Sequence, residues 1–280
     1  MSADDLDAML TGLAARAVER RDIGILWTRE SRHLTDEQRA EMRQRFFVVP
    51  NRLSSALRAT RPDLSESDAE LLAWAVLAIL TSPSYHATEM PAEQLAALLH
   101  HFAGTVCATR DLGEDAPTMP AAPEPGSGLA PGSRREALLS AATKLFNQHG
   151  YHAVSMDDIG AAVGIKSASV YNHFTVKSDL LVAALTRAAG TLQLDMSRAL
   201  VSASTAHDAL HGALDSYIQL ALSHSDLIGA LVSEVMNLPD QQRHEIRQLQ
   251  HDYVAEWVRL LRTDRPGLDE PTARFTFKRH

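Results

Sequence analysis

Apolar residues recur at spacings of three and four along most of the chain, the pattern of amphipathic helices. The clearest case is residues 135–149, whose apolar positions share one face of the predicted helix: Leu138, Leu139, Ala142, Leu145 and Phe146. We find no segment in which apolar and polar residues alternate as they do along a half-buried strand. The sequence therefore predicts an all-α fold.

Two shorter helices are predicted directly after this one. Gly150 ends the first helix, Ser155 is a favourable N-cap for the next, and Gly164 ends that one. Ser167 is a further N-cap, so we expect a third helix that reaches Phe174. Two short helices joined by a tight glycine turn form a helix-turn-helix, whose second helix can enter the major groove of DNA.

The rest of the chain falls into segments of different composition. Periodic segments predict helices over 1–20, 36–60, 65–81, 91–108, 206–223, 227–237 and 240–262. Pro50 lies inside one of them and should kink or split it. A stretch rich in Pro, Gly and Ala indicates a flexible linker. The predicted division is 1–110, a linker at 111–132, the helix-turn-helix unit at 133–185 and a second helical region at 186–280.

Residues 22–69 and 226–273 repeat one another at a constant offset and without a gap. The identical pairs include Asp22/Asp226, Glu30/Glu234, Leu34/Leu238, Asp36/Asp240, Arg39/Arg243, Leu57/Leu261, Arg58/Arg262, Arg61/Arg265, Pro62/Pro266, Glu66/Glu270 and Ala69/Ala273. A repeat of this length indicates a duplicated structural unit.

Several short motifs follow one another in order through residues 133–185. They are Gly150-Tyr151, Ser155 to Gly160, Ala162 to Ile165, Ser169 to Phe174 and Lys177 to Leu181. With these motifs the segment resembles the DNA-binding domain of the tetracycline-repressor (TetR/AcrR) family. The resemblance implies that 186–280 is the helical regulatory and dimerisation domain of that family, and the repeat makes 1–110 a second copy. We expect copy one to lack a DNA-binding unit of its own, and copy two to be truncated before counterparts of the helices at 71–81 and 91–108.

The resemblance also assigns candidate DNA contacts. It places the recognition helix at 167–174, where short side chains would contact base edges through hydroxyl and methyl groups. The base-facing positions are Ser167, Ala168 and Ser169, Lys166 would reach a phosphate or a guanine edge, and Ser155, Tyr171, His173 and Lys177 fall where the family contacts phosphates. Two alternatives stay open, a core position for Tyr171 and a capping or packing role for His173. Asp157 stands where some relatives carry a basic or polar contact, so we leave it out of the site.

In that family a small-molecule pocket lies among the middle helices of the regulatory domain. Candidates for its lining are Trp27, Met42, Phe46 and Phe47 in copy one, and Met236, Tyr253 and Trp257 in copy two. Residues of this kind at helical spacing belong to a core more often than to a binding site. No metal site is expected, because adjacent His100 and His101 face different sides of a helix, and His244 and His251 are two turns apart. No nucleophile–base pair or phosphate loop indicates an enzyme.

Composition narrows the class of protein further. Hydrophobic residues make up 45% of the 280 residues, enough to form cores, and a single cysteine excludes an intrachain disulfide framework. The longest apolar run, 71–80, is too short to span a bilayer, and the acidic amino terminus lacks the basic start of a secretory signal. We therefore expect a cytoplasmic protein. A formal net charge of −8 means that DNA binding must come from a local patch.

These observations predict a ligand-responsive transcriptional regulator, a repressor that binds a palindromic DNA operator as a homodimer joined through residues 65–108. The resemblance implies that an unidentified small molecule changes the spacing of the two recognition helices, so that they no longer match successive major grooves. No cofactor is expected. The alternative is a non-enzymatic interaction protein that pairs with a full-length relative and modulates its DNA binding.

Overall fold

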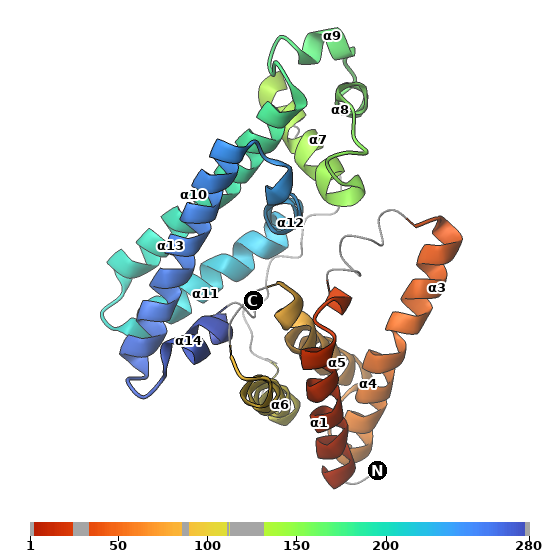
Figure 1. Ribbon diagram of the computed structural model, residues 1–280, viewed down its shortest axis with the longest axis vertical. Coiled ribbons are helices and arrows are strands. Elements are labelled where there is room, and N and C mark those ends of the chain that lie inside the picture. The colour runs from red at the N-terminus through yellow and green to blue at the C-terminus, as the bar shows by residue number, and fades with distance from the viewer. Residues whose placement is uncertain (1–2, 25–33, 86–89, 111, 113–131, 278–280) are drawn as a thin grey trace. The chain divides into compact units, whose positions relative to one another are not determined.

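The computed structural model describes residues 3–24, 34–85, 90–110, 112 and 132–277 of the 280-residue chain (Figure 1). The regular elements in these ranges are helices and no strand occurs among them, which confirms the all-α prediction. The chain divides into two compact units, unit 1 with residues 1–119 and 274–280, and unit 2 with residues 120–273. Of the helices described, none combines the length and the apolar character that a membrane span requires.

Unit 1 is a set of helices packed around an aliphatic core. Its elements are α1 (Ala3–Glu19), α3 (Asp36–Phe46), α4 (Val48–Thr60), α5 (Glu66–Thr81), the 3-10 helix η2 (Ser82–Tyr85) and α6 (Ala92–Ala108). Ser65 caps α5, since its hydroxyl oxygen accepts a hydrogen bond from the N–H of Asp68. Helices α1, α4, α5 and α6 supply the core, which includes Leu10, Leu53, Leu57, Leu72, Val76, Leu95 and Leu99.

Pro50 splits the helix predicted over 36–60, as expected. Helix α3 ends at Phe46 and α4 begins at Val48, so the break lies just before the proline. Proline has no N–H to donate to the carbonyl oxygen four residues earlier, that of Phe46, and its ring crowds the same carbonyl. A single residue therefore turns one predicted helix into two.

Unit 2 contains the three short helices of the central segment, one long helix that leaves them, and the helices that pack on it. Its elements are α7 (Arg134–His149), α8 (Met156–Ala162), α9 (Ser167–Val170), α10 (Lys177–Ser202), α11 (Ala206–Ser223), α12 (Ser225–Ser233), the 3-10 helix η3 (Val235–Asn237), α13 (Asp240–Asp264) and α14 (Glu270–Phe277). The helix predicted over 227–237 is thus divided into α12 and η3. The last residues of α14, from Arg274 onward, cluster with unit 1.

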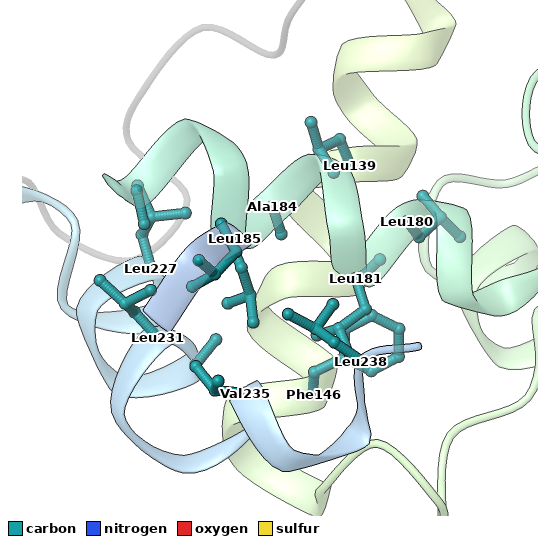
Figure 2. Close-up of a cluster of buried hydrophobic side chains, with 14 of the residues drawn as sticks. Leu139, Phe146, Leu180, Leu181, Ala184, Leu185, Leu227, Leu231, Val235 and Leu238 are labelled. Atoms are coloured by element: carbon teal, nitrogen blue, oxygen red, sulfur yellow. The ribbon is translucent and has the colours of Figure 1, made fainter. Parts of the chain in front are cut away.

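One hydrophobic core joins α7 and α10 to α12 (Figure 2). Phe146 of α7 is fully buried in it. Other side chains of the same core are Leu139 of α7, Leu180, Leu181, Ala184 and Leu185 of α10, Leu227 and Leu231 of α12, Val235 of η3, and Leu238. The hydrophobic core that packs the short helices against one another therefore also packs α12 against them.

The repeated segments form the same turn where α4 and α13 end. Each helix is followed by an arginine, and the backbone angles agree, with φ −130° and ψ 82° at Arg61 and φ −128° and ψ 83° at Arg265. The N–H of Arg61 donates to the carbonyl oxygen of Leu57 at 2.7 Å, and that of Arg265 donates to Leu261 at 2.9 Å. The two turns therefore share the same local geometry.

Candidate nucleic-acid interface

Two glycines and a serine set the geometry of the short helices. Gly150 ends α7 with a φ of 82°, and Gly164 follows α8 with a φ of 72°, values that favour glycine. Ser155 caps α8 as predicted, because its hydroxyl oxygen accepts from the N–H of Asp158 at 3.1 Å, and the Asp158 carboxylate accepts from the N–H of Ser155 at 2.8 Å. The hydroxyl of Ser155 also donates to the Asp158 carboxylate at 2.6 Å, and this bond, together with the one from the N–H of Ser155, holds the pKa of Asp158 below its ordinary value.

Helix α9 is shorter than the helix predicted over 167–174. Its α-helical residues end at Val170, and the next three residues form a turn. The N–H groups of His173 and Phe174 both donate to the carbonyl oxygen of Val170, at 2.9 and 3.0 Å. This tight turn directs Phe174 into the core, where the guanidinium of Arg135 lies 4.6 Å from the centre of its ring. The predicted helix over 167–174 is thus an α-helix only as far as Val170, and a turn leads from it to the buried Phe174.

Most of the predicted DNA contacts lie at the surface. Ser155, Lys166, Ala168, Tyr171 and His173 are exposed, Ser169 is half-buried, and the side chain of Ser167 lies outside the described part of the chain. Tyr171 is 54% exposed, so the alternative that it belongs to the core does not describe this structure. Its phenol and the imidazole of His173 are accessible to a large ligand.

Lys177 has a structural role that the sequence did not predict. Its ammonium group donates hydrogen bonds of 2.7 Å to the carbonyl oxygens of Tyr151 and Val154. The same nitrogen lies 4.2 Å from the centre of the Tyr151 ring, within the range of a cation–π interaction. Partial burial of the ammonium lowers the pKa of Lys177. Two of the three donors of this ammonium therefore fix the first turn of α10 to the loop before α8.

A surface cavity of about 390 Å³ brings part of the predicted site together. It is lined by His152, Ala153, Val154, Ser155, Met156, Tyr171, Thr175, Val176 and Lys177. Three predicted phosphate contacts, Ser155, Tyr171 and Lys177, thus share one concave surface. His152 and Thr175 were missed by the sequence analysis, because they lie in connecting turns and carry no helical pattern. The imidazole of His152 and the hydroxyl of Thr175 add polar atoms to a surface that suits an anionic ligand.

The candidates for a small-molecule pocket differ in their surroundings within each unit. Trp27 lies outside the described residues, whereas Met42 and Phe46 are half-buried on α3 of unit 1. In unit 2, Tyr253 and Trp257 pack edge to face at 6.2 Å, and burial raises the pKa of Tyr253 to about 12. Met236 is 52% exposed and does not share their buried surroundings. Among the described residues, no cluster of His, Cys, Asp and Glu is placed to hold a metal ion.

The geometry of α7 to α10 defines a helix-turn-helix protein. Residues 138–184 match the family model described as bacterial regulatory proteins, tetR family. This segment of the chain is therefore a tetR-family helix-turn-helix domain, as its motifs predicted.

Parts of the chain are also similar to named transcriptional regulators. It is 47% identical over 53 residues to the HTH-type transcriptional repressor ComR of Escherichia coli, covering 19% of this chain and 25% of that protein. It is 33% identical over 92 residues to the HTH-type transcriptional activator FasR of Mycolicibacterium smegmatis, covering 33% of this chain and 42% of that protein. The chain thus spans less than half the length of these two relatives.

Among solved structures, the ketosteroid transcriptional regulator KstR2 of Mycobacterium tuberculosis superposes with a TM-score of 0.49 at 24% identity, covering 53% of this chain and 79% of that chain.

Proposed function

We propose that this chain is a DNA-binding transcriptional regulator that acts in the cytoplasm, and that the α7–α10 unit binds its operator. The observation that carries this proposal is the cavity shared by Ser155, Tyr171 and Lys177 beside the exposed α9. Hydroxyl, phenol and ammonium groups on one surface are typical contacts to DNA phosphates. Two of the three N–H groups of the Lys177 ammonium donate to backbone carbonyls, and the third donates to a DNA phosphate.

Sequence is read at the amino-terminal end of α9. Ala168 is exposed there and Lys166 lies just before the helix, so both reach the floor of a major groove into which α9 is inserted. Ser167, Ala168 and Ser169 have short side chains, which suit hydroxyl hydrogen bonds to base edges and methyl contacts to thymine. The net charge of −8 repels DNA elsewhere, and binding therefore depends on these placed contacts.

The protein acts as a homodimer on a palindromic operator, joined through α5 and α6 of unit 1. Helix α5 buries Leu72 and Val76 in its own unit, yet it leaves Leu71 58% exposed and Trp74 38% exposed. The rings of Phe46 and Phe47 lie 6.1 and 5.1 Å from that of Trp74, which widens the apolar surface. A second copy of the same surface is a suitable cover, and the two-fold axis pairs two helix-turn-helix units.

A small molecule bound among α10, α11 and α13 lowers operator affinity, and the protein represses in its absence. Tyr217 and Tyr253 are partly buried between these helices, and burial raises the pKa of both phenols. Neutral phenols among apolar side chains suit a largely apolar ligand with one or two hydrogen-bonding groups.

The second candidate function is that of a non-enzymatic partner for a full-length relative. The observation that favours it is the turn repeated at Arg61 and Arg265, which gives unit 1 a local fold also found in the regulatory end of unit 2.

A selection experiment separates the two functions. The purified chain is used to select duplexes from a random library, and a selected and a scrambled duplex are then titrated at two salt concentrations. We expect tighter, salt-dependent binding of the selected duplex. Failure to enrich any sequence, together with co-purification of a full-length relative, would favour the partner function.

A further inference from the structure

Glu234, at the end of α12, is a carboxylate buried inside unit 2. Only 2% of the residue is exposed. A buried carboxylate is stable only when hydrogen-bond donors surround it. Its Oε2 accepts from the N–H of Tyr151 at 3.2 Å and from Nδ2 of Asn237 at 2.7 Å, and its Oε1 accepts from the hydroxyl of Ser233 at 2.9 Å. Ser233 and Asn237 are local, whereas Tyr151 belongs to the helix-turn-helix domain.

The first turn of α12 also contacts the helix-turn-helix domain. Nδ2 of Asn147, on α7, donates to the carboxylate of Asp226 at 3.0 Å. Between these two contacts, Gly229 allows close approach, since a Cβ atom there would overlap Oδ1 of Asn147. Helix α12 is therefore held against α7 and the loop after it by two polar contacts, one near each end.

Tyr151 also contacts Lys177, the proposed DNA-contacting residue at the start of α10. It follows Gly150 at the start of the loop, and its carbonyl oxygen accepts the 2.7 Å hydrogen bond from Lys177. The backbone of Tyr151 thus contacts both residues, because its N–H donates to Glu234 and its carbonyl oxygen accepts from Lys177. The cavity that contains Ser155 and Lys177 begins at the next residue, His152.

We propose that Glu234 couples the position of α12 to the position of the phosphate-contacting loop 151–155, and so makes DNA affinity depend on the regulatory helices. The coupling rests on the proposed DNA-binding function. Glu234 is a positioning residue in this scheme, because it contacts the loop and not the DNA. The N–H of Tyr151 donates a directional hydrogen bond to the Glu234 carboxyl group, and this bond fixes the loop more tightly than apolar packing does. Movement of α12 away from α7 lengthens this bond and releases the loop.

The test compares Glu234→Leu, which removes the acceptor oxygens at similar side-chain size, with Glu245→Leu, a matched control at an exposed carboxylate of α13. Amide hydrogen exchange at Tyr151 is measured first. We expect faster exchange at Tyr151 in Glu234→Leu and unchanged exchange in the control. Unchanged exchange at Tyr151 in a folded Glu234→Leu variant would overturn the proposal. Should that variant not fold, Glu234→Asp takes its place, because the shorter side chain withdraws the carboxylate from the N–H of Tyr151.

A double-mutant cycle then tests coupling to DNA binding. Affinity for a selected duplex is measured for Glu234→Leu, Lys177→Met and the double variant. Loss of the hydrogen bond from the N–H of Tyr151 should weaken binding by about tenfold in Glu234→Leu. Because both residues act on the same loop, the double variant should lose clearly less than the sum of the two losses. Additive losses would refute the coupling. If the wild type binds no duplex, the proposed function fails, and the exchange experiment alone decides whether Glu234 holds the loop.

Discussion

The ammonium nitrogen of Lys177 lies 4.2 Å from the ring centre of Tyr151 and donates a 2.7 Å hydrogen bond to the carbonyl oxygen of the same residue. A side chain that the family resemblance assigns to DNA therefore also holds the helix-turn-helix domain together. Stability and affinity are linked at this position, and variants here should change both.

Lys177→Met should lower the free energy of unfolding of unit 2 by about 2 kcal/mol, because two backbone carbonyls lose a charged donor. Lys177→Arg, which keeps the charge, should recover part of the loss. Urea denaturation followed by circular dichroism measures both variants. Equal stability of Lys177→Met and wild type would show that the two hydrogen bonds contribute nothing.

Tyr171→Ala should weaken binding to all duplexes to a similar degree, since an exposed phenol beside the cavity contacts phosphate and not bases. Ser169→Ala should instead change sequence preference with little change in overall affinity. Titration of selected and scrambled duplexes at fixed salt compares them. Wild-type affinity in Tyr171→Ala would remove this residue from the site.

Gly229→Ala should destabilise unit 2 by about 1–3 kcal/mol, because the new methyl group meets the side chain of Asn147. Gly190→Ala is the matched control, since nothing lies within 4 Å of a Cβ atom at that helical position. The control should gain about 0.5–1 kcal/mol from the higher helix propensity of alanine. Thermal unfolding distinguishes the two, and Asn147→Ala should partly rescue Gly229→Ala.

Trp74→Asp should convert the homodimer to monomer, because a charge then lies at the centre of the exposed apolar surface of α5. Ser55→Asp, at an exposed position of α4, should leave assembly unchanged. Light scattering at micromolar concentration reports the mass of each. A wild-type chain that is monomeric in this measurement would contradict the proposed interface.

Cys107 should be unreactive toward thiol reagents at pH 8 in the folded protein and reactive after unfolding. Burial raises the pKa of its thiol from 9.0 to about 11, so little thiolate forms. The raised pKa also sets how stability depends on pH. The contribution of the Cys107 thiol to the free energy of unfolding is fully present below pH 9 and is lost as pH rises toward 11, because this thiol ionises at a lower pH in the unfolded chain. A wild-type titration against Cys107→Ala measures this difference.

The fold was predictable where the signal is local, and the site was predictable only in part. Ser155, Gly150 and Gly164 set helix ends through their own local chemistry, and each does so in the structure. The early end of α9 was not predictable, because no glycine or proline stands at 171–173 to indicate it. Glu234 looks like any surface acid in the sequence, since its bond to Tyr151 joins residues far apart along the chain.

The two repeated sequence stretches differ in the continuity of their helices. Helix α13 is continuous over 25 residues, about 37 Å long at 1.5 Å per residue. The stretch of unit 1 with the similar sequence forms two helices of 11 and 13 residues that meet at Phe47, and Pro50 stands where α13 has Val254. Because proline has no N–H, Pro50 cannot donate to the carbonyl oxygen of Phe46 the helical hydrogen bond that residue 254 can make at the matching place in α13. A difference at one position of two similar sequences thus accompanies one long helix in unit 2 and two short ones in unit 1.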